Sequence, residues 1–120
     1  MILGIGVDLI ELNRIKQAVI KNKRFINRIL TVNERQAYDN LTKFNRKIEY
    51  LAGRFAVKEA FGKATGRGLG SLSFQDIEVL NQNNGAPLVT AKAYQKEQIF
   101  VSISHSKDYV VAQIVINDSK

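Results

Sequence analysis

The sequence contains no cysteine, which excludes disulfide bonds and metal sites with thiolate ligands. It also lacks any apolar run near the roughly 20 residues that a transmembrane helix needs. The apolar start, MILGIGVDLIEL, is interrupted by Asp8 and has neither a basic leader nor a small-residue cleavage site, so it is not a typical secretory signal. We therefore expect a soluble protein of the cytoplasm.

Histidine and acidic residues are scarce. His105 is the only histidine, and no Ser/His/Asp or Cys/His pattern of nucleophilic catalysis is visible. Eighteen Lys and Arg residues against eleven Asp and Glu residues give a net charge of +7. Such an excess favours an anionic partner. Nucleic acid, an anionic membrane surface, a phosphate-rich small molecule and an acidic protein all fit, as does a solvated surface without a partner.

The 120 residues fit a single domain, residues 1–120. Hydrophobic patterning and turn residues predict strands before, and again after, a helical region. This order favours an α+β fold, a mostly antiparallel sheet with a long helix and shorter helices. The expected elements are a strand at 2–9, helices at 11–30, 33–42 and 46–64, a glycine loop at 66–70, and strands at 74–80, 88–92, 98–106 and 109–117.

Asp8 is the first candidate site residue. In the strand at 2–9 it shares one face with Gly4 and Gly6, which allow another backbone or a ligand to approach closely. Considered alone, Asp8 is more typical of a cap for the helix that begins near Leu12. The other interpretation is a carboxylate of a functional site.

Glu59 is the second candidate. On a helix it falls on the same stripe as Leu51, Ala52 and Phe55, and a carboxylate on an apolar stripe is costly unless it is compensated. Lys63 could compensate it as an ordinary i,i+4 ion pair. Alternatively, Glu59 faces a second carboxylate across a cation. Magnesium suits such a pair, because it takes oxygen ligands from one or two carboxylates and from substrate phosphates.

Three segments carry a family resemblance: GIGVDLIEL at 4–12, GRFAVKEAFGKA at 53–64 and VSISHS at 101–106. In this order, and together with SFQDIEV at 73–79, they resemble the holo-[acyl-carrier-protein] synthases, the small bacterial phosphopantetheinyl transferases. The pattern Phe-x-x-Lys-Glu-Ala-x-x-Lys, from Phe55 to Lys63, is the most distinctive of these motifs.

The resemblance implies transfer of 4′-phosphopantetheine from coenzyme A to a serine of apo-acyl carrier protein, with release of adenosine 3′,5′-bisphosphate, in support of fatty acid biosynthesis. It also implies that Asp8 and Glu59 bind Mg²⁺ and that Lys63 lies near the coenzyme A diphosphate. The serine proton would pass to Glu59 or to a metal-bound water, and the sequence leaves both open.

By the same resemblance, His105 and Ser106 would approach the coenzyme nucleotide. His105 shares a strand face with Ile99, Val101 and Ile103, so an ordinary core or edge histidine is the alternative. Relatives often carry lysine between the glycine and proline of the turn at 85–87, where this chain has Ala86. Coenzyme contacts from this turn would therefore come from backbone, at Gly85.

The predicted helix at 11–30 has a basic face. Projected as one continuous helix, its cations occupy an arc of about 80° without an acidic residue, opposite an apolar side. Such an arc favours an acidic partner, and the resemblance supplies one, because acyl carrier proteins are acidic. The predicted carrier-binding residues are Arg14, Lys21, Arg24 and Arg28.

The resemblance also implies a homotrimer with a site at each subunit boundary, as in the small members of the family. Periodicity by itself allows the apolar residues of the last strand, such as Val111 and Ile114, to serve either a core or an interface. Three alternative functions remain at this point: a basic nucleic-acid-binding module, a magnesium-dependent phosphohydrolase, and a non-catalytic relative that keeps only the carrier-binding surface. The carboxylate on an apolar stripe disfavours the first, and the intact Asp8, Glu59 and Lys63 disfavour the last.

Overall fold

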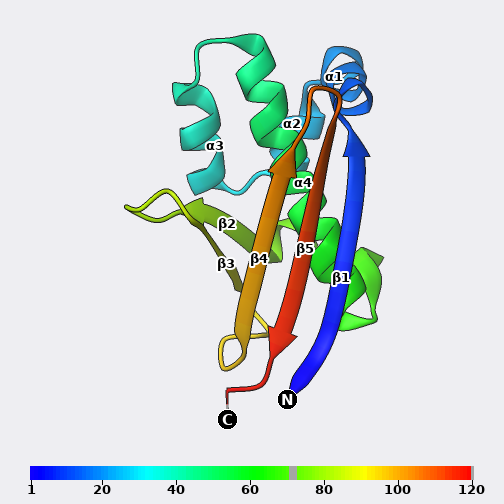
Figure 1. The fold of residues 1–120 in the computed structure, drawn as a ribbon. Helices are drawn as coiled ribbons and strands as arrows, with labels where there is room; N and C mark the ends of the chain where they lie inside the picture. Colours follow the sequence, from blue (N-terminus) through cyan, green and yellow to red (C-terminus); the bar gives the residue numbers. More distant parts are fainter. Residues whose placement is uncertain (71–72, 120) are drawn as a thin grey trace.

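The computed structural model describes residues 1–70 and 73–119 (Figure 1). It confirms the α+β fold. The elements in order are β1 (Ile2–Glu11), α1 (Leu12–Lys21), α2 (Arg24–Ile29), α3 (Val32–Asn40), α4 (Phe44–Thr65), the 3-10 turns η1 (Gly68–Gly70) and η2 (Phe74–Asp76), β2 (Ile77–Asn81), β3 (Pro87–Ala91), β4 (Gln98–His105) and β5 (Tyr109–Asn117).

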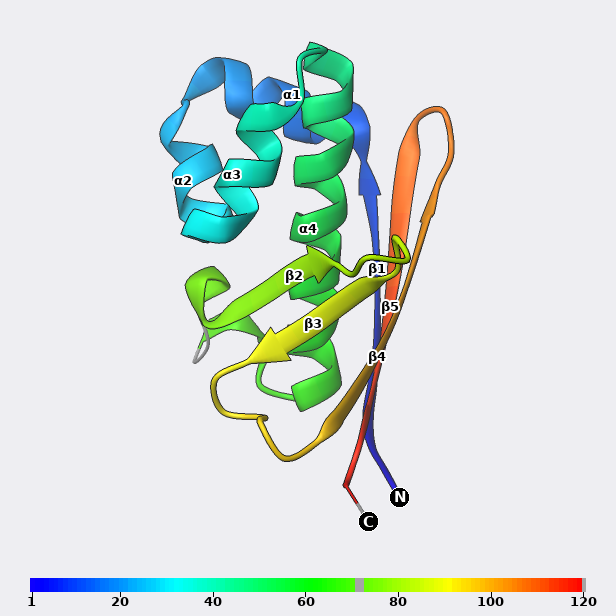
Figure 2. The same ribbon diagram turned by 90° about the vertical axis from the view of Figure 1, so that its left-hand side faces the viewer.

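Five strands form two antiparallel groups. The larger sheet has the order β1-β5-β4, so β1 and β4 are its two edges, and β2 pairs with β3 in a separate hairpin. In the larger sheet Asp8 of β1 and Ile103 of β4 both lie opposite Ala112 of β5. The hairpin crosses beside α4, on the side away from β1 (Figure 2).

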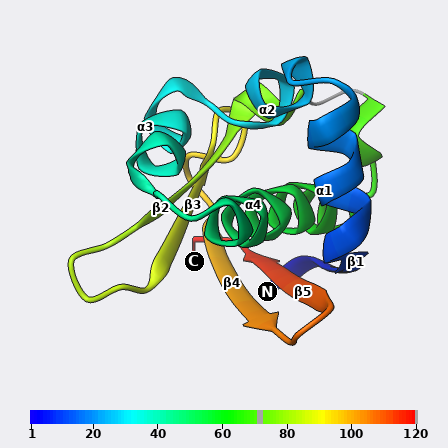
Figure 3. The same ribbon diagram turned by 90° about the horizontal axis from the view of Figure 1, so that it is seen from above.

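Helix α4 is the central element. Figure 3 shows it with the larger sheet on one side and α1, α2 and α3 around the others. Several of its apolar side chains, such as Leu51 and Phe61, are fully buried, as are Val110 and Ile114 on the inner face of β5. Burial of this area stabilises the fold by roughly 1.5–3 kcal/mol for each large side chain. These residues of β5 therefore belong to the core.

Gly4 and Gly6 let α4 lie directly against β1. A Cβ atom at either position would overlap the carbonyl oxygen of Ala64 or of Ala60 on the helix. The sequence predicts that another backbone or a ligand lies close to Gly4 and Gly6, and in the structure it is the backbone of α4. This contact brings Asp8, two residues further along the same face, up to α4.

The prediction of one continuous helix at 11–30 is wrong. Asn22 leaves the helical region at φ −155° and ψ 107°, while its N–H still donates to the carbonyl of Ala18. The side-chain Oδ1 of Asn22 then accepts from the N–H of Arg24, at 3.0 Å. Asparagine thus ends α1 and begins α2, and the chain turns between them, so the basic residues do not form one arc.

The strand predicted at 74–80 begins later, at Ile77. Residues 74–76 form the turn η2 instead, because Ser73 and Asp76 make a capping box: the Ser73 hydroxyl accepts from Gln75 N–H, and Asp76 accepts from Ser73 N–H. The other predicted elements match within a few residues at their ends.

The outer face of the larger sheet is apolar and exposed. On β1, Leu3, Ile5, Val7 and Leu9 are all more than half exposed, and Phe100 of β4 is 55% exposed. These five residues are called the outer sheet face below. No helix in the described part of the chain is long and apolar enough to cross a membrane.

Candidate functional site

Asp8 and Lys63 form an ion pair between β1 and α4. Lys63 Nζ lies 3.0 Å from Asp8 Oδ1 and 3.0 Å from the carbonyl oxygen of Val7. Asp8 does not cap a helix: Glu11 occupies the N-cap position of α1, and within the described residues no side chain caps it. The capping interpretation of Asp8 is therefore wrong, and its side chain is directed to α4.

The second carboxylate oxygen of Asp8 is buried. Oδ2 has no hydrogen-bond partner within residues 1–70 and 73–119. A buried carboxylate oxygen without a partner costs free energy, since it has lost water and gained nothing in exchange. A cation at this oxygen would remove that cost.

Glu59 lies one turn before Lys63 on α4 and is partly buried. Burial raises the pKa of the Glu59 carboxyl, the charge of Asp8 raises it further, and Lys63 and Arg14 oppose these effects. The structure describes no Lys63–Glu59 ion pair; among the described carboxylates Lys63 pairs with Asp8. Lys63 thus makes its ion pair with Asp8, while its charge still opposes the rise in the Glu59 pKa. The charges of Glu59 and Asp8 repel each other.

These two carboxylates fit a divalent cation. Their mutual repulsion and the buried Oδ2 of Asp8 would both be relieved by positive charge between them. Within the described residues there is no group of three or more His, Cys, Asp and Glu side chains that could hold a metal. The donor set of this chain is thus two carboxylates, which suits Mg²⁺ with the remaining ligands supplied by water and phosphate.

A cationic hollow lies at the other edge of the sheet, near the end of β4. It has a volume of about 490 Å³, and Arg46, Arg54 and His105 line it. A second hollow, of about 440 Å³, shares Arg54 and His105 and adds Gly85. The structure therefore brings two of the predicted coenzyme residues, Gly85 and His105, together.

His105 and Ser106 have different surroundings. His105 is exposed, and its Nε2 would lie 3.6 Å from a Cβ atom at Gly53 of α4, so it is not a core histidine. The Ser106 hydroxyl accepts from the N–H of Tyr109 at 3.0 Å, which closes the β4–β5 turn. Ser106 lines neither of these two hollows.

Arg54 is a residue that sequence reasoning missed. It is 7% exposed, its Nε donates to the Val79 carbonyl, and its guanidinium also donates to Asn81 Oδ1, both at 3.2 Å. The guanidinium lies 4.0 Å from the centre of the Tyr50 ring, and burial lowers the pKa of Arg54. The signal available in the sequence was an arginine in the part of the long helix where the neighbouring residues are mostly apolar.

The two groups of residues lie on opposite edges of one sheet. Asp8 is on β1 and His105 is on β4, with β5 between these strands (Figure 1). One chain therefore presents the two carboxylates near the β1 edge of the sheet and the cationic hollow near the β4 edge.

The predicted basic face is divided. Lys21, Arg24 and Arg28 line a hollow of about 440 Å³ between α1 and α2, together with Phe25. Arg14 instead lies close enough to Glu59 to lower its pKa. Three of the four predicted carrier-binding cations thus converge, because the chain bends at Asn22.

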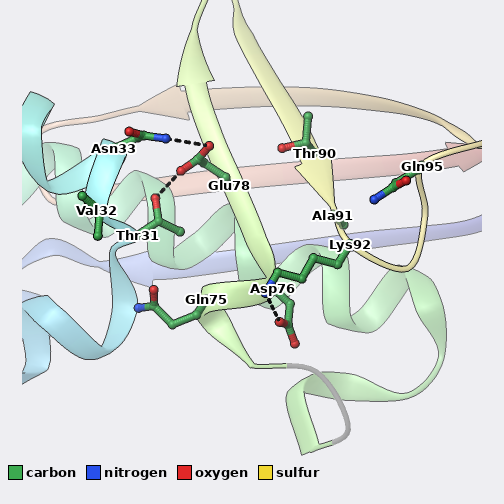
Figure 4. A pocket seen from close by; sticks show the side chains of 10 residues that line it. All are labelled: Thr31, Val32, Asn33, Gln75, Asp76, Glu78, Thr90, Ala91, Lys92 and Gln95. Atoms are coloured by element: carbon green, nitrogen blue, oxygen red, sulfur yellow. Dashed lines mark hydrogen bonds and ion pairs between the residues drawn. The ribbon is translucent and has the colours of Figure 1, made fainter.

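A further hollow, of about 420 Å³, contains none of the predicted site residues (Figure 4). Its Glu78 accepts from the Thr31 hydroxyl at 2.5 Å and from the Asn33 amide at 3.5 Å. These contacts join the start of α3 to β2.

Residues 4–114 match the family model of the 4′-phosphopantetheinyl transferase superfamily. The chain is 53% identical over 116 residues to the holo-[acyl-carrier-protein] synthase of Oceanobacillus iheyensis, with 97% of each chain covered. It is also 53% identical over 117 residues to the holo-[acyl-carrier-protein] synthase of Listeria innocua, with 97% of this chain and 98% of the relative covered.

Solved structures agree. The holo-(acyl-carrier-protein) synthase of Bacillus anthracis, in complex with CoA (3′,5′-ADP), matches with a TM-score of 0.90 at 47% identity and 99% coverage of both chains. The Helicobacter pylori synthase, in complex with coenzyme A, matches with a TM-score of 0.82 at 33% identity, covering 94% of this chain and 99% of that one. The chain belongs to the holo-[acyl-carrier-protein] synthases of the 4′-phosphopantetheinyl transferase superfamily, and it is an enzyme.

Proposed function

We propose that this enzyme transfers 4′-phosphopantetheine from coenzyme A to a serine of an apo-acyl carrier protein and releases adenosine 3′,5′-bisphosphate. The observation that carries this proposal is the Asp8 carboxylate, whose Oδ2 is buried beside Glu59 without a partner in the described part of the chain. Residues 1–120 would form one transferase domain that acts in the cytoplasm and supports fatty acid biosynthesis.

Asp8 and Glu59 would hold Mg²⁺, which when bound neutralises diphosphate charge and orients a displacement at phosphorus. The serine oxygen forms a bond to the phosphorus that carries pantetheine, and the bond from that phosphorus to the bridging oxygen breaks. That oxygen leaves with the bisphosphate, and the serine proton passes to Glu59 or to water. Lys63 and Arg14 supply positive charge beside the carboxylates.

The cationic hollow would bind the nucleotide through Arg54 and His105, with backbone at Gly85 and Ser106 nearby. Because this hollow and Asp8 lie on opposite edges of the sheet, a complete site requires two copies of the chain. A homotrimer joined through the outer sheet face would satisfy this need and would cover its exposed side chains. The complexes of the Bacillus anthracis and Helicobacter pylori relatives support coenzyme A as the ligand.

The carrier protein would dock on α1 and α2. Lys21, Arg24 and Arg28 surround a hollow that contains Phe25, and an acidic helical protein would match this charge. Arg14, between this hollow and Glu59, would contact the carrier near the serine. Such contacts mainly raise the association rate and are screened by salt.

The intact mass of apo-carrier protein tests the reaction. Incubation with enzyme, coenzyme A and Mg²⁺ should add one phosphopantetheine, and chelation of the metal should prevent it. Coenzyme A breakdown without the carrier would support a phosphohydrolase instead. Tight DNA or RNA retention at physiological salt, without carrier modification, would support a nucleic-acid-binding module.

Mixing two inactive variants tests the shared site. Asp8→Ala disables the carboxylate part of the site, and Arg54→Ala disables the cationic hollow. Mixed trimers formed by co-refolding would therefore contain some sites in which both parts are intact. We expect activity to return on mixing, although each variant alone has almost none. No recovery from a mixture shown to contain mixed assemblies would contradict a site shared between subunits.

A further inference from the structure

The cationic hollow near the end of β4 contains a carboxylate that the proposed function does not use. Of the described residues that line it, Glu49 is the one with a negative charge, while Arg46, Arg54 and His105 provide cations or a titratable imidazole. Glu49 Oε1 lies 3.7 Å from Arg46 Nε, one turn away on α4. An anion entering the hollow therefore meets an arginine that is already paired.

This ion pair is weak enough to exchange. The Arg46 and Glu49 side chains are 68% and 42% exposed, and exposed pairs of this kind contribute about 1 kcal/mol or less. Arg54, in contrast, is held by the Val79 carbonyl, by Asn81 and by the Tyr50 ring. An incoming phosphate would thus find Arg54 in place and would have to compete with Glu49 for Arg46.

Three other carboxylates lie near this region. Asp108 shares a different hollow with Glu49 and lines neither hollow that contains His105. Glu34 is completely buried and accepts from the N–H of Val79, while Glu78 accepts from the Thr31 hydroxyl. Glu34 and Glu78 line neither hollow that contains His105. Glu49 is therefore the carboxylate that a ligand of the hollow would face.

The chemistry of coenzyme A identifies the anion, and this step rests on the proposed function. Its anionic groups are a diphosphate and a 3′-phosphate. The diphosphate is the reacting group and belongs with Asp8 and Glu59, so the 3′-phosphate remains for the cationic hollow. The same 3′-phosphate is part of the released bisphosphate.

We propose that Glu49 limits the affinity of this hollow for the 3′-phosphate, by competing with it for Arg46 and by repelling its charge. Coenzyme A and the released bisphosphate both carry the 3′-phosphate. A hollow with higher affinity for that phosphate would therefore strengthen coenzyme A binding and slow bisphosphate release to the same degree. Glu49 keeps the product exchangeable. It is a specificity-determining residue and takes no part in the chemical step.

Calorimetric titration of Glu49→Gln tests this inference, with adenosine 3′,5′-bisphosphate and adenosine 5′-phosphate as probes. We expect the Kd of the bisphosphate to fall about two- to fivefold, the size of one exposed charge interaction. The Kd of adenosine 5′-phosphate, which lacks the 3′-phosphate, should stay the same. The difference should shrink between 0.1 M and 0.5 M salt, because exposed charges are screened.

Glu97→Gln is the matched control. It removes the same charge next to Gln98, at the opposite end of β4 from His105, and should change neither Kd. An unchanged bisphosphate Kd in Glu49→Gln, or an equal change for both nucleotides, would overturn the role of Glu49 while carrier modification persisted. If the wild-type chain neither bound the bisphosphate nor modified the carrier, the proposed function would fail together with this inference.

Discussion

Two of the lysines on helix α4, Lys58 and Lys63, are each paired with a carboxylate from another element. Lys58 and its partner Glu34 are completely buried. Lys58 Nζ donates to Glu34 Oε1 at 2.6 Å, to the Ile29 carbonyl at 2.7 Å and to the Phe74 carbonyl at 3.0 Å. All three protons of the ammonium group therefore have an acceptor.

Both carboxylate oxygens of Glu34 also have donors. Its Oε1 also accepts from the N–H of Thr31 at 2.9 Å, and its Oε2 accepts from the N–H of Val79 at 2.7 Å. The pair thus joins α3, β2 and the ends of α2 and η2 to α4. Burial lowers the pKa of Lys58, and the Glu34 charge opposes that shift.

The pair of Lys63 with Asp8 is different. Lys63 is 55% exposed, and one oxygen of Asp8 stays without a partner in the described part of the chain. The buried Lys58–Glu34 pair, whose ammonium protons and carboxylate oxygens all have partners, holds the fold together. The Asp8–Lys63 pair, in which Asp8 Oδ2 has no hydrogen-bond partner in the described residues, can bind a ligand such as a cation. The contrast shows Lys58 in a structural role, and it supports the proposal that Lys63 belongs to the site.

The largest expected effect is on stability. Lys58→Met leaves the Glu34 charge buried without its cation, and we expect the free energy of unfolding to fall by about 3–5 kcal/mol. Lys63→Met is the matched control, and its loss should be about 1 kcal/mol or less, because that pair is half exposed. Urea denaturation measures both. Equal losses would remove the distinction between the two pairs.

The next effect is on catalysis. Asp8→Asn keeps the shape of the side chain but removes the charge that would bind the metal. We expect the rate of carrier modification to fall at least about a hundredfold, since a bound metal contributes several kcal/mol to such reactions. The variant should remain folded, as judged by circular dichroism. Binding of Mn²⁺ measured by electron paramagnetic resonance should weaken in parallel; unchanged Mn²⁺ binding would exclude Asp8 as a ligand.

A smaller effect is expected at the contact that brings Asp8 to α4. Gly6→Ala forces a methyl group into the Ala60 carbonyl, and we expect it to cost about 1–3 kcal/mol. Gly53→Ala, on α4 itself, meets its nearest neighbour at 3.6 Å and should be neutral or stabilising by up to about 1 kcal/mol. Thermal unfolding of the two variants compares them, and a tolerated Gly6→Ala would argue against direct contact between β1 and α4.

The smallest effect is a pH dependence. The pKa of Glu59 is raised above its ordinary value of 4.5. The folded state therefore binds the carboxyl proton of Glu59 more tightly than the unfolded state does. Stability should therefore fall as pH rises from about the ordinary value through the raised pKa. Without metal, Glu59→Gln should be more stable than wild type near neutral pH, and this advantage should disappear in acid. A constant difference across the pH range would contradict the raised pKa.

Much of the fold and part of the site could be predicted from local pattern. Period-two alternation placed Asp8 with Gly4 and Gly6, and the helical stripe placed Glu59 toward the core, which the partly buried carboxylate agrees with. The break at Asn22 was missed, because a polar residue at that point is compatible with a continued helix. The structure shows the break through the extended backbone of Asn22 and the hydrogen bond from Arg24 N–H to its side chain.

The sequence by itself determined the order of the elements and the faces on which Asp8 and Glu59 lie, because backbone periodicity is local. Tertiary structure alone decided that Lys58 meets Glu34, 24 residues away, and that Lys63 meets Asp8, 55 residues away. The tertiary structure also decided that Asp8, rather than Glu34, has an oxygen without a hydrogen-bond partner in the described residues. The cost of burying a charge depends on every group packed around it, and those groups come from distant parts of the chain.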